Sequence, residues 1–146
     1  MPFDSRGADM FPLITFPDIE AWATRWLHAK TSVMSQYAWA SKLTFDNVIP
    51  RDGDRPEYLV VINRDGGATY EHLDHPRLRI NVWAPHEDEC EEICRVLGGL
   101  LLIARTDTSE PVAEAAVNGS SRIADETGGT RRAFWASLIT TGTQGA

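Results

Sequence analysis

Several features of extracellular, membrane-spanning and nucleic-acid-binding proteins are missing from this chain of 146 residues. Its two cysteines, Cys90 and Cys94, lie four apart on a predicted helix, where backbone geometry disfavours a disulfide, so they give no sign of an oxidising compartment. The apolar run 96–104 is too short to cross a bilayer and contains two glycines. Residues 1–16 lack the apolar stretch of a signal peptide. The formal net charge of −7 argues against a general nucleic-acid surface. We expect a soluble, cytoplasmic protein without specific nucleic-acid or membrane binding.

Catalytic signatures are also missing. The sequence contains no nucleophile elbow, P-loop or dinucleotide fingerprint, and its glycine pairs are isolated. Gly66-Gly67 and Gly128-Gly129 fit turns. Gly98-Gly99 falls inside a predicted helix, where each glycine costs about 1 kcal/mol relative to alanine. Close packing of that helix on the sheet or on a neighbour would explain this glycine pair. Because no catalytic motif is present, we predict neither an enzyme nor a cofactor.

The centre of the chain changes its hydrophobic period at Pro85. Before Pro85, apolar and polar residues alternate, which predicts a strand with one buried face. After it, apolar residues recur every three or four positions, which predicts a long helix whose acidic first turns suit the helix dipole. The alternating apolar residues are Leu78, Ile80 and Val82, the polar ones are Arg77, Arg79 and Asn81, and the helical stripe is Cys90, Ile93, Cys94, Leu97, Leu100, Leu101 and Ala104.

The remaining elements follow from the same patterns. A first helix should begin at Pro17-Asp18 and end near Thr31. Strands are expected over 43–48, 57–63, 68–83, 112–124 (one strand made of 112–117 and 122–124, interrupted at Asn118-Gly119-Ser120) and 131–140, with a hairpin turn at Asp65-Gly66-Gly67. This order, α-β-β-β-α-β-β, predicts an α+β fold with a mostly antiparallel sheet of about five strands packed with two helices. We expect an N-terminal arm over 1–15, a single domain over 16–141 and a flexible tail over 142–146.

Two predicted strands are apolar on both faces. Residues 58–62 are apolar throughout, and the last strand has Trp135 and Ile139 on the face opposite Phe134. Because two helices cover only one face of such a sheet, apolar surface would remain exposed and would indicate a partner burying about 800 Å² per subunit. The alternative is that the N-terminal arm or the segment 32–41 covers this face.

Two groups of residues have the composition of a metal site. His72, Asp74 and His75 do not share one strand face, and we interpret them as surface polar residues before a bend. His86, Cys90 and Cys94 share a helix face, but the cysteines fit the apolar stripe, where a buried thiol behaves as a small hydrophobe. We therefore predict no metal.

Three segments resemble a known family. They are F-P-D-I-E-A-W over 16–22, D-x-P-R-L-R-I-N-V-W-A over 74–84, and R-R-A-F-W-A-S-L-I over 131–139. In sequence and in the order of elements they resemble small tail terminator proteins of actinobacterial siphophages, over roughly residues 11–141. Family members often begin where Met10 stands here, so residues 1–9 are an extension or Met10 is an alternative start.

The resemblance implies a structural virion protein without enzymatic activity. Tail terminators form a ring, usually of six subunits, that caps the finished tail tube and joins it to the head-side connector. The expected partners are copies of the chain, the major tail tube protein and the head–tail connector, with DNA passing through the ring. The expected location is the tail and neck of the virion, assembled in the host cytoplasm. The candidate interface residues are Phe11, Leu13, Tyr58, Arg77, Arg79, Trp83, Trp135 and Ile139.

Two other functions stay open at this point. A neighbouring neck component, such as a connector or stopper protein, can have the same size and α+β pattern. A small enzyme or metal-binding protein would need the histidine and cysteine groups to converge with further ligands.

Overall fold

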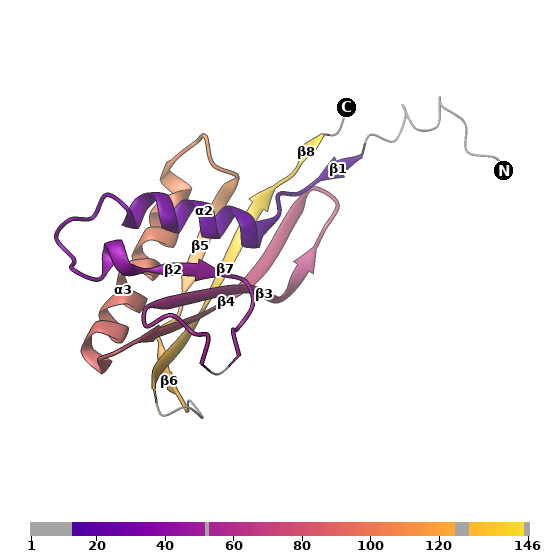
Figure 1. Ribbon diagram of the computed structural model, residues 1–146. Coiled ribbons are helices and arrows are strands. Elements are labelled where there is room, and N and C mark those ends of the chain that lie inside the picture. The colour runs from indigo at the N-terminus through magenta and orange to yellow at the C-terminus, as the bar shows by residue number, and fades with distance from the viewer. Residues whose placement is uncertain (1–12, 52, 125–128, 145–146) are drawn as a thin grey trace.

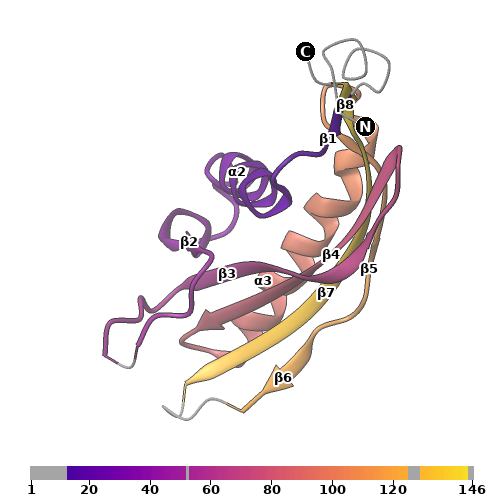
Figure 2. The same ribbon diagram turned by 90° about the vertical axis from the view of Figure 1, so that its right-hand side faces the viewer.

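The computed structural model describes residues 13–51, 53–124 and 129–144. It is an α+β fold in which two helices, α2 (Ile19–Thr31) and α3 (Glu87–Ile103), lie on the same side of a mixed sheet (Figures 1 and 2). The sheet order is β2-β3-β4-β7-β5, and β6 extends the β5 side by pairing with β7. These strands are β2 (Thr44–Asp46), β3 (Leu59–Thr69), β4 (Leu73–Ala84), β5 (Val112–Val117), β6 (Ser121–Ile123) and β7 (Thr130–Thr141).

Both helices form where the apolar periodicity predicted them. The Asp18 side chain accepts a hydrogen bond from the Ala21 backbone N–H at 3.2 Å and so caps α2. One face of each helix is buried against the sheet. Gly98 accounts for part of the predicted close packing, because an added Cβ would lie 3.0 Å from Val117 Cγ1. Gly99, in contrast, has open space beside it.

The predicted hairpin turn at Asp65-Gly66-Gly67 is wrong. These residues lie within β3, where the pairing with β4 shifts register between Arg64 and Gly67 and forms a bulge. The chain turns instead after Thr69, and the Tyr70 N–H donates to the Leu73 carbonyl at 2.7 Å. Gly67 has φ of 91°, and an added Cβ would lie 2.0 Å from the His75 carbonyl oxygen. The glycines therefore fit a bulge as well as they fit a turn.

The order and pairing of the strands also differ from the predicted α-β-β-β-α-β-β arrangement with about five strands. β2 pairs in parallel with β3, although the other pairs in the sheet are antiparallel. The two short outer strands β1 (Ile14–Thr15) and β8 (Thr143–Gln144) pair with each other. β8 lies within the segment 142–146 that is expected to form a flexible tail. Residues 1–12 of the predicted arm lie outside the described part of the chain.

Burial corrects the argument from apolar strand faces. On the helix side, Val60 and Ile62 belong to the main core. On the opposite side, Leu59, Val61 and Trp83 form a second cluster, each no more than 1% exposed. The strand that was expected to leave apolar surface in water is thus covered on both faces within one chain.

The loop between β2 and β3 lies against this second cluster. The guanidinium of Arg55, from that loop, lies over the Trp83 ring at 5.8 Å, and the guanidinium of Arg131 lies over it at 4.7 Å. Nearby, the Asn63 amide donates to the Asn47 carbonyl at 2.6 Å. The segment 32–41 is not this cover, because Trp39 packs in the main core on the helix side.

Candidate interaction surfaces

The sheet face opposite the helices brings four of the predicted interface residues together. Antiparallel pairing places Arg79 beside Trp135 and Arg77 beside Ser137, and Ile139 follows two residues further along β7. Neither helix covers this part of the sheet (Figure 2). We call the surface made by Arg77, Arg79, Trp135, Ser137 and Ile139 the outer face.

The β3 bulge organises the outer face. Its Asp65 carboxylate accepts the Trp135 indole N–H at 3.0 Å, and its backbone carbonyl accepts the Arg77 Nε–H at 2.8 Å. The Arg79 guanidinium lies 5.5 Å from the centre of the Trp135 ring. The bulge at the predicted turn thus holds an arginine and an indole in place on the outer face.

The other predicted interface residues lie elsewhere. Tyr58 and Trp83 are buried within the chain, at 9% and 1% exposure, so neither side chain is presented to a partner in this conformation. Leu13 is 69% exposed next to β1. Phe11 lies outside the described residues.

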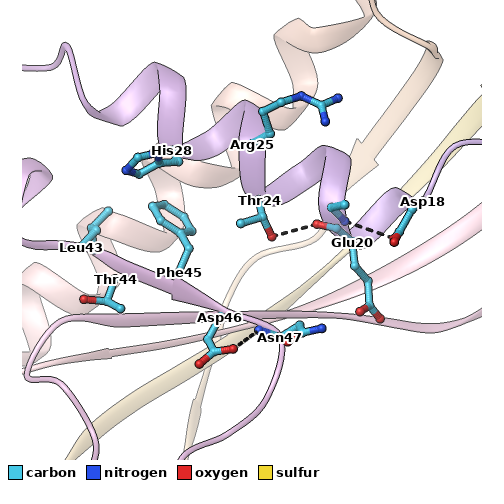
Figure 3. A pocket seen from close by; sticks show the side chains of 11 residues that line it. Asp18, Glu20, Thr24, Arg25, His28, Leu43, Thr44, Phe45, Asp46 and Asn47 are labelled. Atoms are coloured by element: carbon cyan, nitrogen blue, oxygen red, sulfur yellow. Dashed lines mark hydrogen bonds between the residues drawn. The ribbon is translucent and has the colours of Figure 1, made fainter.

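Sequence patterns did not indicate the groove between α2 and β2. Figure 3 shows residues from both elements lining it, with a volume of about 700 Å³. His28 of α2 meets Phe45 of β2 edge to face, with ring centres 5.7 Å apart, across the groove. β2 pairs with β3 at one end of the sheet and α2 packs over both strands, so only the tertiary fold forms this groove. The groove is lined by Asp18, Glu20, Ala21, Thr24, Arg25, His28, Leu43, Thr44, Phe45, Asp46 and Asn47.

The acidic first turns of α3 make contacts beyond the helix dipole. Glu87 pairs with Arg132 of β7, and Glu92 accepts the Trp39 indole N–H at 2.7 Å. Glu89 accepts the Tyr58 hydroxyl at 3.0 Å, and burial together with this hydrogen bond raises the pKa of Tyr58. These carboxylates therefore attach the helix to the core.

The groups with metal-site composition have structural roles instead. The buried Asp74 accepts two hydrogen bonds from the Arg64 guanidinium, at 2.7 and 2.8 Å, and His72 is exposed in the β3–β4 turn. Cys90 is buried and its thiol donates to the Val82 carbonyl at 3.3 Å. The neighbouring Cys90 sulfur and burial raise the pKa of the Cys94 thiol. Across the described ranges, no three His, Cys, Asp or Glu side chains are grouped to hold a metal ion.

Comparison with known proteins adds no assignment. No family model matches the chain, and no curated protein matches it. Among the described helices, none is long and apolar enough to span a bilayer. The geometry therefore defines an α+β domain with two kinds of candidate contact surface, the outer face and the groove beside β2.

Proposed function

We propose that this chain is a structural virion protein of the tail terminator type, which forms a ring on the end of a siphophage tail tube and joins it to the head-side connector. The proposal begins from the resemblance of residues 16–22, 74–84 and 131–139 to that family. The protein would act by the complementarity of its shape and charge to the end of the tube, without a chemical step.

The observation that supports the proposal most directly is the composition of the outer face. Arg77, Arg79, Trp135 and Ile139 come from two neighbouring strands, and no helix lies over them. Arginine and tryptophan are enriched in the energetically important centres of protein interfaces. Trp135 and Ile139 are half-buried, so a partner would complete their burial.

A ring requires two different contact surfaces on each subunit, related by a rotation that closes. The outer face and the groove beside β2 differ in position and in composition, so one subunit offers distinct surfaces for its neighbours and for the tail tube. The argument from uncovered apolar strand surface, however, is limited to β7, since the chain itself covers the outer side of β3.

The test is removal of this protein from an assembling phage. We expect tails of uncontrolled, excessive length in electron micrographs, because nothing stops polymerisation of the tube. Tails of normal length that are detached from full heads would contradict the terminator role and assign the chain to the connector side of the neck.

A further inference from the structure

The sheet ends in two unpaired edges. β2 forms one end of the strand order and β5 forms the other, and within the described residues no strand pairs with the outer side of either. Exposed edges are usually protected by charge, proline or a covering element, because they can pair with another chain. Only one residue of β5, Glu114, is charged, and β5 contains no proline.

Alternation along each strand shows which backbone groups face outward. The Asn118 N–H donates to the Trp135 carbonyl on β7 at 3.1 Å, so the N–H and C=O groups of Ala115 and Val117 point away from β7. The Thr44 N–H donates to the Tyr58 carbonyl, next to β3, at 3.0 Å. The N–H and C=O groups of the following residue, Phe45, therefore point away from β3. The β5 edge therefore presents donors and acceptors at alternate residues, as another strand needs, and the β2 edge presents those of Phe45.

The part of the β3 edge that extends past β2 is covered rather than open. There the Arg64 N–H donates to the Glu20 carboxylate of α2 at 2.6 Å. A side chain of the same subunit thus occupies this part of the edge. The fold thus protects this segment of β3, and the Asp46 carboxylate accepts the Asn47 N–H at the end of β2, whereas the outward groups of Phe45 and of β5 have no strand partner among the described residues.

Each open edge has a hollow on the helix side of the sheet. Beside β2 it is the groove under α2 (Figure 3), lined in part by Ala21 and Thr24 of α2. Beside β5 it is a hollow of about 460 Å³ under α3, lined in part by Glu91, Gly99 and Leu102. A Cβ added at Gly99 would meet no atom within 4 Å, and Leu102 is 41% exposed.

We infer that the β5 edge of one copy pairs with the β2 edge of the next copy, so that the sheet continues from subunit to subunit. The partner is a second copy because one chain carries both unlike edges, at opposite ends of one sheet. The pairing also brings α2 of one copy beside α3 of the other, with the small residue Ala21 lining the groove of one copy and Gly99 lining the hollow of the other. Repetition around a closed ring leaves no free edge. This inference rests on the proposed ring assembly and names its contact.

Two substitutions test the pairing without disrupting the subunit. Ala115→Pro removes an outward N–H, and proline is tolerated on an edge strand where its missing N–H faces solvent. Gly99→Gln fills the hollow beside β5, and it should stabilise the isolated helix because glutamine is the better helix former. Each variant should raise the protein concentration needed for half-assembly at least about tenfold, the effect of one lost interfacial hydrogen bond or its equivalent.

The control is His72→Gln, an exposed position in the β3–β4 turn away from both edges. It should assemble as the unchanged chain does. Circular dichroism and thermal unfolding establish that each variant is folded, and if Ala115→Pro does not fold, Gly99→Gln alone decides. Amide hydrogen exchange at Phe45, Ala115 and Val117 should also slow as assembly proceeds.

The outcomes separate this inference from the proposed function. A ring that forms equally well with both substitutions, and without new amide protection at either edge, overturns edge pairing but leaves the terminator role standing. A ring that depends on both edges but does not limit tail length supports edge pairing and contradicts the terminator role. A chain that stays monomeric at every concentration, alone and with the tail tube protein, overturns both.

Discussion

Carboxylate side chains hold several large aromatic residues of this molecule in place. Trp22 donates its indole N–H to Glu110 at 2.7 Å, and Trp39 and Trp135 donate theirs to Glu92 and Asp65 in the same way. A buried indole needs an acceptor, and a charged acceptor makes the hydrogen bond stronger. Part of the acidic excess of the chain therefore serves internal contacts.

Asp74 offers the clearest test of an internal ion pair. Replacing it with asparagine removes the charge that Arg64 pairs with, and we expect the free energy of unfolding at pH 7 to fall by about 2 kcal/mol. The Asp74 side chain is 3% exposed, whereas that of Arg64 is 32% exposed, so solvent compensates part of the loss. Urea denaturation of both proteins measures the difference, and an unchanged midpoint would contradict this role for the pair.

The same residue makes a prediction about acid. Burial acts to raise the pKa of Asp74, but hydrogen bonds from Arg64 and Thr69 outweigh it and hold this pKa below its ordinary value. A lowered folded-state pKa stabilises the fold above the unfolded-state pKa, and that stabilisation is lost as pH falls through the folded-state value. Below about pH 4, the unchanged protein should therefore lose stability more steeply than Asp74→Asn. Parallel pH profiles of unfolding would contradict the shift.

Gly67 tests the β3 bulge. Gly67→Ala places a Cβ against the His75 carbonyl in a conformation with φ of 91°, so we expect a loss of about 1–3 kcal/mol in the free energy of unfolding. Gly119→Ala is the matched control, because its added Cβ meets nothing within 4 Å. Equal stabilities of the two variants would show that the bulge tolerates a side chain.

At the scale of elements, the two adjacent glycines of α3 should respond differently. Gly99→Ala adds helix propensity in open space, and at low protein concentration it should stabilise the fold by about 1 kcal/mol. Gly98→Ala should gain less or lose stability, because its Cβ would press on Val117 of β5. Thermal unfolding of both variants compares them, and equal gains would contradict close contact between α3 and β5 at Gly98.

Sequence patterns predicted the helices and the long strands because their signals are local. The stripe of α2 and the alternation of Leu78, Ile80 and Val82 in β4 repeat over many residues, and both were confirmed. The sequence pattern gave a wrong prediction at Asp65-Gly66-Gly67, because this composition is typical of both a hairpin turn and a β-bulge. The parallel pairing of β2 could not be predicted, because it depends on a crossover that three residues do not encode.

For the candidate surfaces, too, local patterns predicted strand faces but not contacts that depend on the tertiary fold. Alternation placed Arg77 and Arg79 on one face of one strand and Trp135 and Ile139 on one face of another, and the pairing of β4 with β7 puts these two faces on the same side of the sheet. It could not show that Trp83 is covered within the chain, because its cover includes Arg55 from a separate loop. Nor could it reveal the groove beside β2, which is formed by tertiary packing.

At the scale of the whole molecule, the outer face should contribute to contacts within the tail. Arg77 has a half-exposed side chain, and Arg77→Gln removes its charge without burying a new group. We expect weaker binding of the tail tube protein at low ionic strength, by about threefold to tenfold, and a smaller difference at high salt because exposed charges are screened. The control is Arg51→Gln, at another exposed arginine. Equal binding by the unchanged protein, Arg77→Gln and Arg51→Gln would show that Arg77 does not contribute to the contact.

Self-association is the central claim, and the mass of the particle in solution tests it most directly. The chain has a mass of 16.2 kDa, and six copies would have a mass of about 97 kDa. Size-exclusion chromatography with light scattering, over increasing concentration and with tail tube protein added, should show a discrete closed oligomer near that mass. A constant mass of 16.2 kDa under all of these conditions would contradict the ring and the function proposed from it.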